Sequence, residues 1–217
     1  STSRLFYQQC GFSILSPTNR YVLPLNSCIY QNLLAKSVDL ICVEKWVEQY
    51  EKGRNFVEPS NLDAEAAAEV WEKTTFPQAL FSLYRNVDFW KWRYIESSGF
   101  QYIFFGAPKI SGMIVARVET IISETNKEMN NKKIFRIIEI LPKNSKIWNG
   151  EEDTNLIDLF HGAIDWAIQE GCIAADFYCS TQRFEPVLNS VGFKKYDPKE
   201  DPITSLALMF QPLKFIG

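Results

Sequence analysis

Three consecutive segments of this chain are rich in β-branched and aromatic residues, and this run of strand-like sequence constrains the possible folds more than any other feature. The segments cover residues 102–105, 112–121 and 134–141. A Pro-Lys pair separates the first two, and the charged stretch 124–133 separates the last two. Such segments with short polar breaks between them are typical of neighbouring antiparallel strands. The sequence therefore predicts three consecutive antiparallel strands in its central part.

Helical patterns flank these strands on both sides. Residues 155–170 place their apolar side chains on one stripe, and Gly171 follows as a helix stop. Residues 61–73 are rich in alanine and begin with carboxylates, and residues 77–96 give a second helical region with an apolar face. The remaining elements are a short strand at 175–179, a helix at 183–191 and a last strand at 203–211. This order predicts an α/β (α+β) fold with a mixed, mostly antiparallel sheet flanked by helices.

One sequence pattern occurs twice, near the start and near the end of the chain. Residues 5–12 and 184–193 both read as a short helix stopped by Gly-Phe, and the strand-like runs 21–25 and 205–210 follow them. Glycine stops a helix because it enters the left-handed conformation without a Cβ penalty. The repeat predicts the terminal helix and strands of a preceding unit in residues 1–26, a helical connector in 27–54 and a complete domain in 55–217.

Composition excludes several functional classes. The net charge is only −3 and the pI is about 5.4, so the chain has no basic field to hold nucleic-acid phosphates. No apolar run approaches the length of about 18 residues that a membrane span needs. The five cysteines form no CxxC pair, and the single histidine argues against a zinc site. We therefore expect a cytoplasmic protein with reduced thiols and no metal.

Three sequence details, taken with the order of elements, resemble the GNAT superfamily of acyl-CoA-dependent N-acyltransferases. Residues 89–94 read Phe-Trp-Lys-Trp-Arg-Tyr and lead into the first long hairpin, residues 139–142 read Glu-Ile-Leu-Pro at the end of the third strand, and Gly192-Phe193 precedes the last strand. The resemblance covers roughly residues 55–211. The chain is most similar to the C-terminal unit of tandem-GNAT transferases of bacterial surface-polysaccharide and cell-envelope biosynthesis.

This resemblance implies a reaction and its partners. In such enzymes a splayed pair of strands binds the pantetheine of acyl-CoA, and a primary amine attacks the thioester. The implied function is therefore N-acyl transfer from acyl-CoA (acetyl-CoA) to a small-molecule amine, such as an amino sugar or a cell-envelope precursor. A preceding GNAT-like unit or another protomer is the implied protein partner.

Glu139 and Tyr178 are the catalytic candidates that the resemblance implies. Glu139 occupies the strand position from which these enzymes recruit a base, and alternation along the strand places it on the same face as Phe135 and Ile137. A structural salt bridge of Glu139, for example to Arg117 or Arg136, is the alternative. Tyr178 is a candidate acid for the leaving thiolate, and an aromatic residue at a sheet edge is the alternative.

The loop after the third strand occupies the place of the pyrophosphate motif, Arg/Gln-x-x-Gly-x-Gly/Ala. The resemblance assigns acyl-CoA binding to Ile140, Leu141, Lys143, Lys146 and Gly150. The loop departs from the motif because Ile147 and Trp148 are bulky where the backbone should approach phosphate. Three carboxylates at 151–153 would also repel an anion at the start of the next helix. These departures favour a second hypothesis, a catalytically silent GNAT-like module that binds a ligand or scaffolds its partner.

Three further residues are candidates for binding the acceptor. Trp92 belongs to an aromatic cluster at helical spacing, and Arg93 beside it is suited to a sugar phosphate or carboxylate. Core packing and a structural ion pair are the alternatives for these two residues. Cys179 lies where acceptor and thioester would meet, but a buried thiol is the alternative because no activating base lies near it in the sequence.

Overall fold

The computed structural model describes residues 13–17, 19–26, 56–78, 83–96, 99–122, 127–195 and 207–210. The predicted first helix at 5–12, the helical connector at 27–54 and the beginning of the last predicted strand lie outside these described residues.

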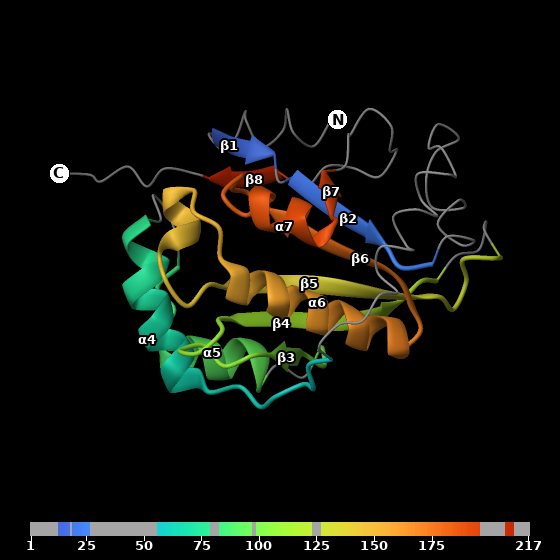
Figure 1. Ribbon diagram of the computed structural model, residues 1–217, viewed down its shortest axis with the longest axis horizontal. Helices are drawn as coiled ribbons and strands as arrows, with labels where there is room; N and C mark the ends of the chain where they lie inside the picture. Colours follow the sequence, from blue (N-terminus) through green and yellow to red (C-terminus); the bar gives the residue numbers. More distant parts are fainter. Residues whose placement is uncertain are drawn as a thin grey trace.

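A six-stranded sheet forms the centre of the fold, in the order β3-β4-β5-β6-β2-β7 (Figure 1). In chain order its strands are β2 (Asn19–Pro24), β3 (Ile103–Phe105), β4 (Met113–Thr120), β5 (Lys133–Leu141), β6 (Cys172–Cys179) and β7 (Lys194–Lys195). Strands β5 and β6 are parallel, and the other neighbouring pairs of this sheet are antiparallel. The predicted antiparallel run of three strands and the mostly antiparallel sheet are confirmed.

Strand β2, from the start of the chain, lies inside this sheet between β6 and β7. It pairs antiparallel with β6 from Asn19↔Cys179 to Pro24↔Ala174. A separate two-stranded sheet joins β1 (Ser13–Pro17) to β8 (Ala207–Phe210). The place beside β6 is therefore filled from the beginning of the chain, and the described part of the last predicted strand pairs with β1. The assignment of residues 1–26 to a preceding unit stays a prediction.

Two helices with side-chain caps lie on one face of the sheet. Helix α4 (Ala64–Thr74) begins after Asp63, whose carboxylate accepts a hydrogen bond from the Ala66 N–H at 2.9 Å. A short 3₁₀ helix, η1 (Phe76–Gln78), follows, and α5 (Val87–Tyr94) begins after Asn86, which caps the Phe89 N–H. Within the helical region predicted at 77–96, the described α-helix therefore begins only at Val87, because the Asn86 side chain caps it there.

Helices α6 (Thr154–Gln169) and α7 (Glu185–Val191) cover the other face (Figure 1). The 3₁₀ turn η2 (Lys146–Asn149) connects β5 to α6. Gly192 ends α7 with φ of 101° and a Schellman-type bond from the Phe193 N–H to Leu188 O. The predicted long helix and the predicted Gly-Phe stop are both confirmed.

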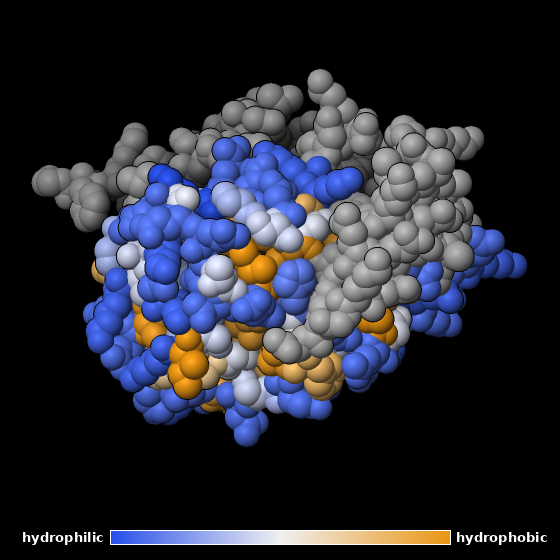
Figure 2. Space-filling view, in the orientation of Figure 1, coloured by the Kyte–Doolittle hydropathy of each residue, from blue (hydrophilic) through white to orange (hydrophobic). Residues whose placement is uncertain are grey.

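Two apolar clusters fill the space between sheet and helices. The cluster under α6 and α7 contains Phe135, Ile137 and Ile140 of β5, whereas the cluster under α4 and α5 contains Trp71, Trp90 and Leu141. No helix within the described residues is long and apolar enough to cross a bilayer. The described surface in the view of Figure 2 is mainly hydrophilic, with small separate hydrophobic patches.

Candidate functional site

The parallel strands β5 and β6 separate towards their carboxyl ends. Their pairing runs from Lys133↔Cys172 to Ile137↔Phe177, yet β5 continues to Leu141 and β6 to Cys179. The last residues of both strands therefore lie beyond the recorded ladder between them. Main-chain groups that face such a divergence are the ones with which an extended ligand arm would form hydrogen bonds.

A β-bulge in β5 decides which way Glu139 faces. Val115 of β4 lies opposite Glu139, and the next residue of β4 lies opposite Ile137, so Ile138 is the extra residue. The inserted residue breaks the alternation along β5. Glu139 therefore faces α5, and the prediction that it shares a face with Phe135 and Ile137 is wrong.

Glu139 is held by two groups from the segment that contains α5. Arg85 forms an ion pair with one carboxylate oxygen, and the Tyr94 hydroxyl donates a hydrogen bond to the other. The Glu139 side chain is 10% exposed and the Arg85 side chain is 26% exposed. Burial raises the pKa of Tyr94 to about 12, so its hydroxyl keeps its proton near neutral pH and remains a donor.

The ion pair proposed for Glu139 exists, but with a different arginine from those predicted. Arg117 pairs with Glu119, and Arg136 pairs with Glu119 and with the buried Asp176. These side chains belong to β4, β5 and β6. Arg85 takes the place of the two expected partners because it lies in the loop directly before α5.

Tyr178 lies near this ionic network at the end of β6. Its ring lies under the guanidinium groups of Arg20 at 5.4 Å and Arg136 at 5.8 Å, measured to the ring centroid. Tyr178 and Asp176 alternate with the core residue Phe177, so both point to the same face as Glu139. The two catalytic candidates thus share one face of two neighbouring strands, and their roles stay predictions.

The loop in the place of the pyrophosphate motif is closed by its own hydrogen bonds. The main-chain N–H groups of residues 146 and 148–151 all donate within the loop, at 3.0 to 3.3 Å. Asp153 caps α6 by accepting from the Leu156 N–H, and it is 1% exposed. Gly150 ends η2 with φ of 79°. The groups that would cradle a diphosphate are therefore engaged internally, and a carboxylate occupies the start of the helix.

An aromatic chain links this loop to the diverging end of β6. The Trp148 ring lies 5.5 Å from that of Phe184, and the Phe184 ring lies 6.2 Å from that of Phe177, measured between centroids. Ile147 is buried in the core beside them. The bulky residues that depart from the motif are therefore packing residues on the α6 side of the divergence.

The predicted acyl-CoA-binding residues fall into two groups. Ile140 and Leu141 lie on β5 beyond the last pair with β6, and they pair with β4 on the other side. Lys143 and Lys146 lie in the following loop, and the Lys143 ammonium donates to Ile110 O at 3.0 Å. The structure brings these residues to the same end of the sheet as Glu139, and their role stays a prediction.

The predicted acceptor residues are dispersed. Trp92 is 62% exposed on α5 and contacts Phe89. Arg93 stacks on the rings of Tyr94 and Tyr102, both at 5.8 Å to the centroid. Cys179 is buried in the cluster under α6, on the opposite side of the sheet from Glu139.

The buried thiols of Cys172 and Cys179 are expected to resist alkylation. Burial raises the pKa of each thiol to about 11, so at pH 8 about one molecule in a thousand carries the reactive thiolate. Their modification by iodoacetamide should rise only as the pH approaches 11, as measured by mass spectrometry of each cysteine peptide. In the urea-unfolded chain both should react at pH 8. Equal rates in the folded and unfolded chain would show that these thiols are accessible.

Sequence reasoning missed Arg85 and assigned Tyr94 only to an apolar face. Arg85 is an isolated cation in the sequence, and only its place before the Asn86 cap gives a signal that it lies at the start of a helix. Its guanidinium also lies against the rings of Trp71 and Phe89. Nothing in the local sequence pairs it with a strand more than 50 residues away.

No family model and no curated protein matches the sequence. Among solved structures, the N-myristoyltransferase of Saccharomyces cerevisiae with bound myristoyl-CoA superposes with a TM-score of 0.55 at 14% identity, over 85% of this chain and 49% of the other. A structure of the yeast enzyme with myristoyl-CoA and inhibitors gives a TM-score of 0.50 at 12% identity, over 86% and 48%. A third gives 0.51 at 14% identity, over 83% and 46%.

The chain has the GNAT-like fold of N-myristoyltransferase. It spans about half the length of that enzyme. At this identity the likeness establishes the fold, and the activity has to be argued from the site itself.

Proposed function

We propose that this chain is a GNAT-type N-acyltransferase module that transfers an acyl group from acyl-CoA to an amine. The observation that carries the proposal is the divergence of β5 and β6 after Ile137↔Phe177, with Glu139 at its edge. An extended pantetheine arm fits along strand residues whose main-chain groups lie beyond the ladder. The likeness to enzymes solved with myristoyl-CoA supports this reading of the divergence.

The proposed reaction uses Glu139 and Tyr178 on the same face. The amine nitrogen attacks the thioester carbonyl, a C–N bond forms, and the C–S bond breaks. Glu139 takes the proton that the amine loses, directly or through water, and Tyr178 returns a proton to the leaving thiolate. The ion pair of Glu139 with Arg85 must open before the carboxylate can accept this proton, and the acceptor enters the reaction as the neutral amine.

The loop between β5 and α6 leads us to expect that the diphosphate of the donor adds little to its affinity. Because its amides are engaged internally, we expect acetyl-CoA and S-acetyl-pantetheine to bind with dissociation constants within about threefold of each other, less than about 0.7 kcal/mol. Isothermal titration calorimetry of both ligands measures this directly. Acetyl-CoA binding about 100-fold tighter would show that the loop does hold the diphosphate. Failure of both ligands, and of longer acyl-CoA, would contradict acyl-CoA as the donor.

The acceptor is proposed to be an amino sugar or another cell-envelope precursor, and a further GNAT-like unit or a second protomer is proposed to complete the site. The half-length coverage of N-myristoyltransferase supports a second unit.

A catalytically silent GNAT-like module that binds a ligand or scaffolds its partner is the second candidate. The aromatic chain from Trp148 to Phe177 favours it, because these rings occupy the α6 side of the divergence. The Trp148→Ala variant separates the candidates. Donor binding that appears only in this variant would support the silent module, whereas acyl transfer to an amine by the wild-type chain would support the enzyme.

A further inference from the structure

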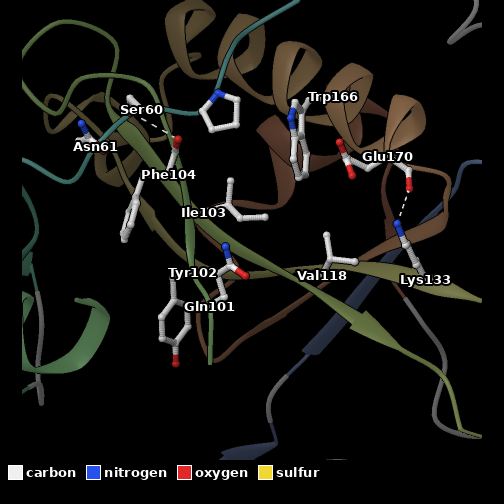
Figure 3. A pocket seen from close by; sticks show the side chains of 11 residues that line it. Ser60, Asn61, Gln101, Tyr102, Ile103, Phe104, Val118, Lys133, Trp166 and Glu170 are labelled. Carbon is white, nitrogen blue, oxygen red and sulfur yellow. Dashed lines mark hydrogen bonds between the residues drawn. The ribbon is translucent and has the colours of Figure 1, made fainter. Parts of the chain in front are cut away.

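A cavity of about 500 Å³ lies between the edge strand β3 and the C-terminal end of α6 (Figure 3). Its volume is within the usual range of about 300 to 1,000 Å³ for small-molecule sites. Glu139 faces the other side of the sheet, and Lys133 of the cavity lies six residues before it on β5, about 20 Å away at about 3.3 Å per residue. Trp166, Ile103 and Val118 of the cavity lie on the α6 side of the sheet, opposite to Glu139, whereas Tyr102 and Phe104 of its wall reach the α5 side and contact the ring of Tyr94.

One aromatic side chain provides the main apolar surface of this cavity. Trp166 projects into it from α6, above Ile103 of β3 and Val118 of β4 (Figure 3). The indole is fixed on its inner side by Phe105, with ring centroids 5.4 Å apart, and it remains half-buried. A ring held in this way offers a rigid apolar platform at little cost in conformational entropy.

The polar groups around this platform are mixed donors and acceptors. Asn61 and Gln101 are exposed on the cavity wall, and each carboxamide both donates and accepts. The Lys133 ammonium donates to the main-chain oxygen of Glu170 at 3.1 Å, and the Glu170 carboxylate adds an acceptor beside it. The two formal charges balance, and no arginine lines the cavity. This lining does not favour a phosphate or another strong anion.

We propose that this cavity is a binding site for a neutral saccharide. A sugar ring presents an apolar C–H face to an aromatic platform, and its hydroxyls each donate and accept at the rim. Those are the two kinds of group that Trp166 and the surrounding amides, ammonium and carboxylate offer together. The proposal goes beyond the acyl-transfer function and does not depend on it, because it uses neither the divergence of β5 and β6 nor Glu139.

Saturation-transfer NMR and calorimetry with glucose, N-acetylglucosamine, cellobiose and N,N′-diacetylchitobiose test the proposal. We expect at least one of them to bind with a dissociation constant below about 10 mM. Trp166→Leu should weaken that binding at least about tenfold through loss of the platform, and Gln101→Ala should weaken it by a smaller factor. The matched control is Phe76→Leu, which removes an aromatic side chain that is 44% exposed on η1 and outside the cavity, and should leave binding unchanged.

Any one of three outcomes would overturn the proposal of a saccharide site. None of the four sugars binds, or Trp166→Leu leaves sugar binding unchanged, or methyl phosphate binds more tightly than the sugars. Gln101 is exposed, so Gln101→Ala keeps the test valid even if Trp166→Leu disturbs folding. Thermal unfolding of each variant provides that check. Failure to bind acyl-CoA has no bearing on these results.

Discussion

Replacing Glu139 by glutamine is expected to lower the rate of acyl transfer by about 100- to 10,000-fold, the usual contribution of a positioned general base. Glutamine keeps the size of the side chain but accepts no proton from the attacking amine. The variant also leaves Arg85 without its carboxylate, so some loss of stability is expected as well. Release of free thiol from acyl-CoA in the presence of an amine measures the rate.

The matched control for this variant is Glu119→Gln. Glu119 is also a strand carboxylate on the same face, paired with Arg117 and Arg136, but it lies on β4 away from the divergence. A base role for Glu139 predicts that Glu119→Gln keeps its activity. A similar loss of activity in both variants, in proportion to their loss of stability, would reduce Glu139 to a structural ion pair. Tyr94→Phe should give an intermediate loss, because the Glu139 carboxylate then loses one donor.

Asp176→Asn is expected to lower the free energy of unfolding by about 3 to 5 kcal/mol, the typical cost of removing one partner from a buried ion pair. Asp176 is 1% exposed and accepts three hydrogen bonds, each 3.0 Å long, from the guanidinium groups of Arg20 and Arg136. Asparagine carries no charge and turns one acceptor into a donor that faces arginine. The half-buried guanidinium groups of Arg20 and Arg136 then lose the negative charge that balances most of their own charge.

Urea unfolding followed by circular dichroism measures this change. Glu119→Gln again serves for comparison, because the Glu119 side chain is 28% exposed and water can solvate the arginines that it leaves. Its expected cost is about 1 kcal/mol or less. If Asp176→Asn lowers the free energy of unfolding as little as Glu119→Gln does, the ion pairs of Asp176 with Arg20 and Arg136 are solvated.

The elements with a strong local pattern were predictable from sequence. Strands β3, β4 and β5 and helix α6 follow from their composition and period, and Gly192 marks the end of α7. The helical region predicted at 77–96 was bounded less well, because its apolar pattern starts before the Asn86 cap at which the described α-helix begins. Local signals were sufficient for these elements because helix hydrogen bonds and caps join residues that are close in sequence, and because strand-forming composition is itself a local property.

The candidate site depended on contacts between distant residues. The place of Glu139 at the end of a strand identified it as a candidate. The face on which its side chain lies could not be predicted, because the bulge at Ile138 depends on the register in which β5 pairs with β4. Arg85 precedes β3 and β4 in the sequence, whereas Glu139 follows them on β5. The two side chains meet only because α5 packs on the sheet. The loop after β5 was predicted to depart from the pyrophosphate motif, and the structure adds that its main-chain N–H groups donate to carbonyl oxygens within the loop.

The sequence by itself determined the order of the elements and the class of the fold, since hydrophobic period and helix caps act within a few residues. Only the tertiary structure decided that β2 lies beside β6, that β8 pairs with β1, and that Glu139 turns towards α5. The physical reason is that strand pairing is made by main-chain groups, which are the same in every residue. Which strand fills a place in the sheet, and which face a bulged residue takes, is therefore set by the packing of the whole chain.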